Sequence, residues 1–212
     1  MSCPTGRTWL VVLCVGAFVA SSGPGWSQTT QPAVTAPPPV TARVPATGPS
    51  DVLRAIPADA WGFVVIRNMQ GLSNKIAALG QQLSLPVPAI LPMLKGLTGI
   101  LVGLDDSGSL AVVVTDPSKF SPPVGLLVPV TDLQAMLQPL GPQDVGDGVQ
   151  QISFMGQPSF VVPFGRYAVI APAKELAVHL AKLTGGVAGK LDPSRQAAYD
   201  NADIFAHVEL AS

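Results

Sequence analysis

The chain has 212 residues, of which only 12% are charged, and its formal net charge at pH 7 is −1. So small a net charge provides no electrostatic attraction to nucleic acid or anionic lipid, and we expect no nucleic-acid partner. Both cysteines, Cys3 and Cys14, lie close to the N-terminus. The remainder of the chain therefore cannot use a disulfide, a thiol nucleophile or a thiolate metal site.

The first residues have the pattern of an export signal. Arg7 supplies a positive n-region, an apolar stretch runs from Trp9 to Ala20, and small residues follow. This stretch of 12 residues rises only about 18 Å as a helix, well short of the ~30 Å hydrocarbon core of a bilayer. We predict a cleaved signal peptide at 1–27 and a location in the periplasm, the cell envelope or outside the cell. An uncleaved signal that anchors the chain in the membrane is the alternative.

Residues 28–50 are expected to form a linker. They hold six prolines and several threonines but one charged residue, Arg43. This composition favours an extended, disordered, proline-rich segment without a core. Order is expected to begin at residue 51, with a short helix that Ser50 caps and Pro57 ends.

Three segments of the domain predicted at 51–212 share one pattern, in which an apolar strand-like run is followed by a polar break and an amphipathic helix. The segments are 61–79, 124–140 and 167–183. Leucine or isoleucine recurs on each helix with the spacing of one apolar face. These residues are Leu72, Ile76 and Leu79; Leu133, Leu137 and Leu140; and Leu176, Leu180 and Leu183.

Further strands are predicted at 109–116, 148–155, 158–164 and 203–210, with Gly156-Gln157 as a hairpin turn. Strands joined by short turns favour antiparallel pairing. The predicted fold class is therefore α+β: a mainly antiparallel sheet with helices on one face, built of pseudo-repeated strand-helix-strand units. Because the last strand has no turn or polar tail after it, we expect the domain to be truncated at its C-terminus.

The stretch from Leu85 to Leu104 is strongly apolar. Its 20 residues hold one charge, Lys95, but also several prolines and glycines that make a poor membrane span. We predict a buried helix here. A segment that lies at or in a membrane is the alternative.

Few residues offer chemistry. His179, at the margin of an apolar stripe, is expected to be a half-buried packing residue. Asp203, His207 and Glu209 alternate onto one face of the last predicted strand, and such a set could hold a divalent metal. A solvated sheet face, or a surface that awaits missing strands, is the favoured interpretation.

Residues 105–109 resemble a calcium loop only superficially. Leu110 stands at the position where that loop needs glycine, and we predict a turn.

No nucleophile elbow, zinc-protease motif, Walker loop or dinucleotide fingerprint occurs in the sequence. We therefore assign no catalytic, cofactor-binding or metal residue and no cofactor. The chain is predicted not to be an enzyme.

Four stretches carry a resemblance to a known kind of protein. They are VLRAIPADAWGFVVIRN (52–68), GLDDSGSLAVVV (103–114), LLVPVTDLQAML (126–137) and GDGVQQISFMGQPSFV (146–161). With them, residues 51 to about 210 resemble a family of uncharacterised exported bacterial proteins. The resemblance implies export and a longer parent protein, and it carries no assigned activity or site residue.

We thus predict an exported, non-catalytic binding or structural domain. Its expected partner is a protein or an envelope component, bound through an exposed apolar surface, and self-association is left open. One alternative is a hydrolase or metal-dependent enzyme that uses Asp203, His207 and Glu209. Another is an envelope protein held by its uncleaved signal, the one case in which membrane contact is expected.

Overall fold

The computed structural model describes residues 51–182 and 186–209, so the predicted signal peptide, the linker and the Ser50 cap lie outside the described residues. The described strands are β1 (Gly62–Ile66), β2 (Leu110–Val114), β3 (Val124–Pro129), β4 (Gln143–Asp144), β5 (Gln150–Phe154), β6 (Gln157–Phe164), β7 (Tyr167–Ala171) and β8 (Ile204–Val208). The described helices are α1 (Asp51–Ala55), α2 (Met69–Gln82), α3 (Ile90–Thr98), α4 (Leu133–Leu137), α5 (Lys174–Leu180) and α6 (Pro193–Asn201), with the 3₁₀ helices η1 (Gln138–Leu140) and η2 (Val187–Gly189).

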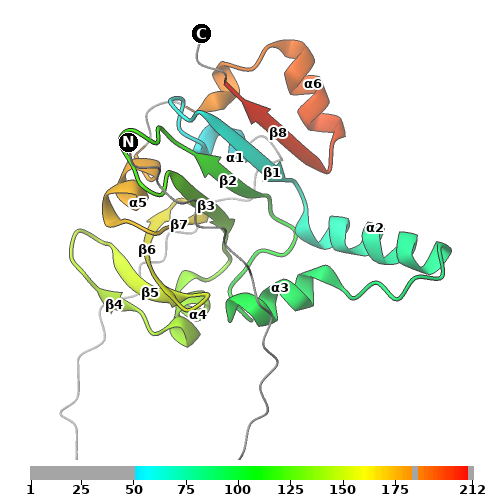
Figure 1. The fold of residues 1–212 in the computed structure, drawn as a ribbon, viewed down its shortest axis with the longest axis horizontal. Coiled ribbons are helices and arrows are strands. Elements are labelled where there is room, and N and C mark those ends of the chain that lie inside the picture. Colours follow the sequence, from blue (N-terminus) through cyan, green and yellow to red (C-terminus); the bar gives the residue numbers. More distant parts are fainter. Residues whose placement is uncertain (1–50, 183–185, 210–212) are drawn as a thin grey trace, which may run out of the picture. The chain divides into compact units, whose positions relative to one another are not determined.

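All the strands join in one sheet of order β4-β5-β6-β7-β3-β2-β1-β8 (Figure 1). Every neighbouring pair is antiparallel, which confirms the predicted α+β class with an antiparallel sheet. The β5–β6 hairpin turns at Met155-Gly156, where both residues have positive φ. The last strand pairs with the first, Phe63 opposite His207, so β8 forms one edge of the sheet.

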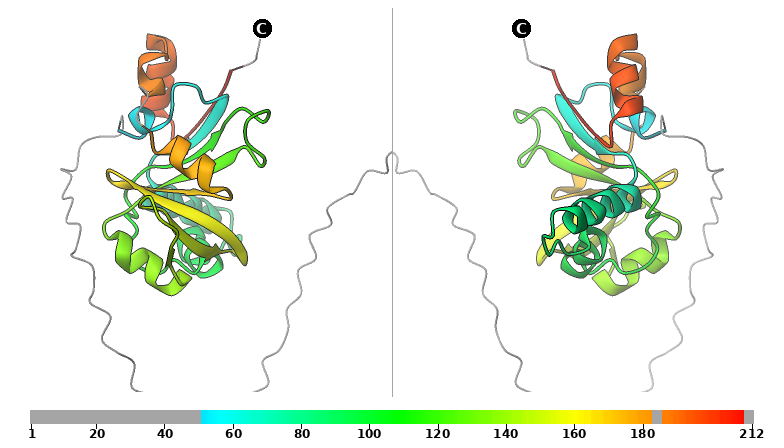
Figure 2. Two further views of the ribbon diagram at one scale, coloured as in Figure 1. Left: turned by 90° about the vertical axis from the view of Figure 1, so that its left-hand side faces the viewer. Right: turned by 90° about the vertical axis from the view of Figure 1, so that its right-hand side faces the viewer.

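Helices cover both faces of this sheet. Successive strand residues point to opposite faces, and Leu127 belongs to a core cluster with Leu180 of α5, whereas Val128 belongs to another with Met136 and Leu137 of α4. Figure 2 shows α5 and α4 on opposite sides of the strands. The expectation that helices gather on one face is therefore not confirmed.

The three segments of similar pattern each form a strand and then a helix, but the helices differ in what they bury. Leu137 and Leu176 are fully buried, as their stripes predicted. On α2, Leu79 is 54% exposed. The residues that α2 buries are Met69, Ser73 and Gly80, because α2 packs on α3 rather than on the sheet. The pseudo-repeat is not confirmed, and Leu183 lies outside the described residues.

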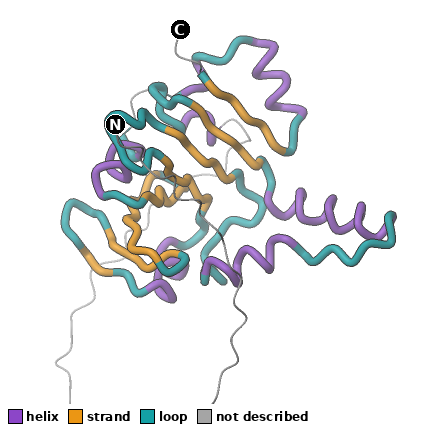
Figure 3. Tube along the Cα trace, viewed as in Figure 1, coloured by secondary structure: helices purple, strands orange, loops and turns teal. Residues whose placement is uncertain are grey.

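We call residues 69–102 the helical arm. In Figures 1 and 3, α2 runs outward from the end of β1 and α3 returns antiparallel to it. Two contacts join parts of the arm: the Leu91 N–H of α3 donates to Ser73 Oγ of α2 at 3.4 Å, and Gly80 of α2 leaves room for Val87 of the segment between the helices. The predicted buried helix at Leu85–Leu104 is wrong, because only Leu91 and Ile100 are buried there. None of the helices described here has the length and apolarity needed to cross a bilayer.

Candidate functional site

The three residues of the predicted metal set are separated in the structure. The Asp203 carboxylate lies 2.7 Å from Lys75 Nζ, at one end of β8. The His207 ring contacts that of Phe63 at 5.3 Å between centroids, and Glu209 follows the other end of the strand. Among residues 51–182 and 186–209, no three His, Cys, Asp or Glu side chains gather as a metal ion would require.

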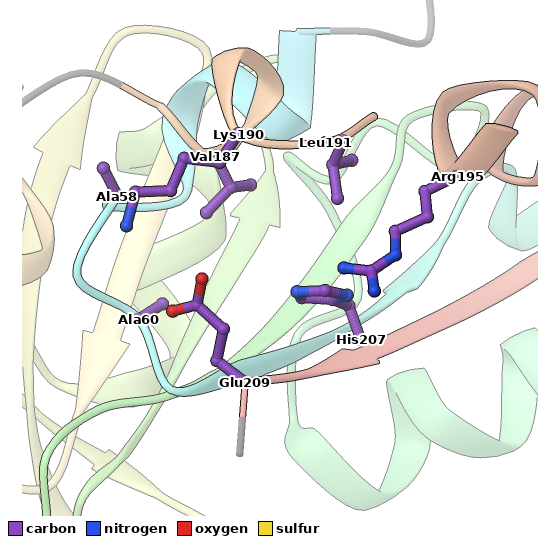
Figure 4. A pocket seen from close by; sticks show the side chains of 8 residues that line it. All are labelled: Ala58, Ala60, Val187, Lys190, Leu191, Arg195, His207 and Glu209. Atoms are coloured by element: carbon purple, nitrogen blue, oxygen red, sulfur yellow. The ribbon is translucent and has the colours of Figure 1, made fainter. Parts of the chain in front are cut away.

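His207 and Glu209 do share a small pocket (Figure 4). Its lining residues are Ala58, Ala60, Val187, Lys190, Leu191, Arg195, His207 and Glu209. Arg195 extends into it from α6, and Arg195 Nε also lies 3.2 Å from the Asp192 carboxylate. The cavity volume of about 30 Å³ holds one or two water molecules, whereas small-molecule sites usually enclose ~300–1,000 Å³. This pocket therefore supports no catalytic assignment.

His179 has a structural environment. Its side chain is 29% exposed and lies against the Phe120 ring at 5.0 Å between centroids, which confirms the predicted half-buried packing role. Its Nε2 atom lies 3.1 Å from an Asp59 carboxylate oxygen. The sequence did not reveal this partner, because 120 positions along the chain separate the two residues.

The Asp105 segment is a turn, as predicted. The backbone N–H and hydroxyl of Ser107 donate to Asp105 Oδ1 at 3.2 and 2.7 Å, and Arg166 donates to Oδ2 at 2.6 Å. Burial raises the pKa of the Asp105 carboxyl, but the Ser107 and Arg166 hydrogen bonds and the Arg166 charge bring it below its ordinary value. Protein donors thus occupy both carboxylate oxygens.

The most distinctive surface of the described residues lies on the helical arm. Nine of their sixteen exposed large apolar side chains belong to it. They are Leu79, Leu83, Leu85, Val87, Met93, Leu94, Leu97, Leu101 and Val102, with exposed fractions from 37% to 62%. Contiguous apolar exposure on this scale marks interaction sites in soluble proteins.

The apolar side chains of the two arm helices lie on one side of the hairpin. On α2, Leu72, Ile76 and Leu79 flank the buried side of the helix, and on α3, Leu94 and Leu97 flank its buried side. Successive helix residues are turned by 100° about the helix axis, and on this count both leucine sets are turned in the same direction away from the buried side of their own helix. Because α2 and α3 run antiparallel and face each other with their buried sides, a turn in the same direction brings both sets to the same face of the pair. We call this surface the apolar face of the arm.

The apolar face has no free charge. Lys75 and Lys95 are the only charged residues of the arm. Each lies 2.7 Å from an aspartate carboxylate of the same chain, Lys75 from Asp203 and Lys95 from Asp106. One signal for this surface is visible in the sequence: residues 76 to 94 include no charged residue.

A smaller apolar surface lies on the sheet. Val208, Gly62, Val114 and Val124 are successive cross-strand neighbours from β8 to β3, so they share one face. Val64 and Ile204 lie on the same face, because strand residues two apart point to the same side. The exposed fractions of these five apolar side chains are 36% to 68%. Together the five present less apolar surface than the nine of the arm.

The chain matches no protein-family profile, no curated protein and no solved structure. The resemblance to exported bacterial proteins accordingly stays a prediction.

Proposed function

We propose that the chain is an exported, non-catalytic domain of the bacterial cell envelope or its surroundings, which binds its partner through the apolar face of the arm. The uncovered leucines of α2 and α3 carry this proposal. Nine half-exposed side chains, at about 100 Å² each when whole, leave on the order of 450 Å² of apolar surface in water. A patch of about 300–600 Å² is the largest on a typical monomer and is often functional.

The positions and contacts of the candidate catalytic residues support the non-catalytic part of the proposal. Asp203 pairs with Lys75, His207 packs on Phe63, and the pocket that His207 shares with Glu209 holds no more than water. An enzyme needs its reacting groups to converge within hydrogen-bond reach of one substrate. This arrangement favours a binding domain over a hydrolase or a metal-dependent enzyme.

Export is supported by the N-terminal sequence pattern, and it is tested by fractionation. Cells that express the full reading frame are separated into cytoplasm, membrane and exported fractions, and the intact mass of the product is measured. We expect an exported product that lacks roughly the first 20 to 27 residues. A cytoplasmic product that retains Met1 would contradict export.

The binding role is tested by photo-crosslinking in those cells. A photo-reactive residue replaces Leu97 in one variant and Met155 in the other, two apolar positions of matched exposure, 62% and 64%. We expect adducts to an envelope component or to a second copy from position 97 and few from position 155. Equal yields from the two positions would rule out the arm as the binding surface.

A further inference from the structure

We propose that the apolar face of the arm is covered by the arm of a second copy, so that the chain forms a two-fold symmetric dimer. This inference rests on the proposed function, since it names the partner that the face binds. In the dimer, α2 and α3 of both copies form an antiparallel four-helix arrangement.

The helix-hairpin structure of the arm favours a second copy of the chain as the partner. A helix buries its apolar stripe against another element, and each arm helix already uses one side on its neighbour within the hairpin. The stripes that remain, with Leu79 on α2 and Leu97 on α3, lie on one common face. Two such faces brought together complete a four-helix bundle, and a two-fold axis lets one surface serve both copies.

The charges of the arm also favour a second copy. A two-fold axis brings the same surface of both copies together, so an unpaired lysine on the face would place like charges on both sides of the interface. The ion pairs of Lys75 with Asp203 and Lys95 with Asp106 remove that repulsion within each chain.

A lipid surface fits the arm less well. Helices that lie in a membrane interface carry free Lys or Arg on the polar face, and Trp or Tyr gathers at the headgroup level. Residues 69–102 hold no tryptophan, tyrosine or phenylalanine, and both lysines are ion-paired.

The exposed apolar area of the whole arm, of which the face is a part, is comparable with the area that a stable dimer buries. A standard interface buries about 800 Å² per partner, of which about 56–65% is non-polar, or roughly 450–520 Å². The arm leaves on the order of 450 Å² of apolar side-chain surface exposed. The sheet surface supplies less, with five exposed apolar side chains against nine.

The dimer is tested by the mass of the full chain in solution, purified in the form to which the cell processes it. Sedimentation equilibrium is compared for wild type, Leu79→Glu/Leu97→Glu and two single controls, Met155→Glu and Val208→Glu. We expect twice the chain mass for wild type and both controls, and a twofold drop for the arm variant. All four positions are more than half exposed, so circular dichroism and thermal unfolding should show that the chain stays folded in each variant.

Cysteine crosslinking supplies a second measurement that does not weaken the face. Leu79→Cys, Leu83→Cys and Leu97→Cys are oxidised singly, with Met155→Cys as control and Cys3 and Cys14 replaced by serine. We expect at least one arm variant to form a disulfide-linked dimer and the control to form none.

Several outcomes would overturn the dimer. A monomeric wild type whose Leu97 position crosslinks to an envelope component would leave the proposed function standing and refute this inference. A monomer without adducts would refute both. Loss of the dimer in Val208→Glu alone would place the interface on the sheet, and arm-dependent binding of a monomer to phosphatidylcholine vesicles would make lipid the occupant.

Discussion

The Arg166 guanidinium lies 2.6 Å from the Asp105 carboxylate, so one ion pair joins the turn before β2 to the turn between β6 and β7. The side chains are only 23% and 17% exposed, and Arg166 lies outside the turn that Asp105 forms with Ser107. The pair connects parts of the sheet that are separated by 61 positions in sequence.

Replacement of Asp105 by asparagine should lower the free energy of unfolding at pH 7 by about 1–3 kcal/mol, because Arg166 loses a charged partner in a partly buried site. The pKa of Asp105 is below its ordinary value of 3.8, so the folded state favours the carboxylate. Its contribution is present above pH 3.8 and is lost as the pH falls through the lower folded-state pKa. Urea unfolding at pH 7 and pH 2 should show the difference between variant and wild type shrinking in acid. The control, Asp200→Asn, should change stability by less than about 0.5 kcal/mol at either pH, and an equal loss in both variants would contradict the assignment.

Local patterns were enough to predict every described strand except the two-residue β4, Gln143–Asp144. The alternation of β8 and the turn of the β5–β6 hairpin act over a few residues. Strand β8 is found where it was predicted, and the hairpin turn is Met155-Gly156, one residue before the predicted Gly156-Gln157. Helix α6 was missed, although Asp192 followed by Pro193 is a typical helix start; the Asp192 side chain accepts from the Ser194 and Arg195 N–H groups.

Which apolar side chains are buried depends on how the helices pack in the tertiary structure, and a local sequence pattern does not predict this packing. Leu79 and Leu137 occupy similar stripes on helices that follow strands, yet one is 54% exposed and the other fully buried. The difference lies in what each helix packs on, since α2 pairs with α3 and α4 lies on the sheet.

The predicted metal-binding set of Asp203, His207 and Glu209 is not formed, for a geometric reason. Asp203 and His207 are four positions apart in extended backbone, which spans about 13 Å, too far for a shared ion.

Gly80 controls how closely the two halves of the arm approach. A Cβ at this position would lie 2.7 Å from Val87 Cγ2 and 3.3 Å from the Leu85 carbonyl oxygen. Gly80→Leu should therefore displace residues 83–89 and raise their proteolysis and hydrogen-exchange rates, while the global unfolding transition stays nearly unchanged. The matched control is Gly96→Leu in α3, where a Cβ meets nothing within 4 Å. Equal protection of 83–89 in both variants would show that this approach does not hold the arm together.

Gly125 on β3 leaves the space that Leu180 of α5 fills. A Cβ at Gly125 would collide with Leu180 Cδ1, and Leu180 is fully buried. We expect Gly125→Val to destabilise the domain by about 1–3 kcal/mol through overpacking, and Leu180→Ala by about 2–5 kcal/mol through the cavity it creates. The double variant should lose less than the sum of the two, because the new methyl groups occupy the cavity. Denaturant unfolding of all four proteins measures this coupling, and strict additivity would contradict the contact.

Arg67, just after β1, holds the C-terminal end of α6. Its guanidinium donates to the carbonyl oxygens of Tyr199 at 3.1 Å, Ala202 at 3.4 Å and Asp200, and it lies 5.3 Å from the centre of the Tyr199 ring. The last carbonyls of a helix have no partner within the helix and carry partial negative charge, so a cation there is stabilising. All three hydrogen bonds come from one nitrogen, Nη1, and the guanidinium carbon lies over the Tyr199 ring, so the connection between β1 and α6 depends on the length and planar shape of the side chain as well as on its charge.

Arg67→Met should therefore lower the free energy of unfolding by about 1.5–3 kcal/mol. Arg67→Lys should lie between this variant and wild type, because an ammonium group keeps the charge but ends one bond closer to the backbone than Nη1 and lacks the planar group that lies on the Tyr199 ring. Hydrogen exchange should rise most in 193–208, which contains α6 and β8. The matched control is Arg195→Met on α6, whose exposed ion pair with Asp192 should contribute no more than about 1 kcal/mol. If Arg67→Met and Arg195→Met lost the same stability and exchanged alike over 193–208, Arg67 would not be what fastens α6 to the sheet.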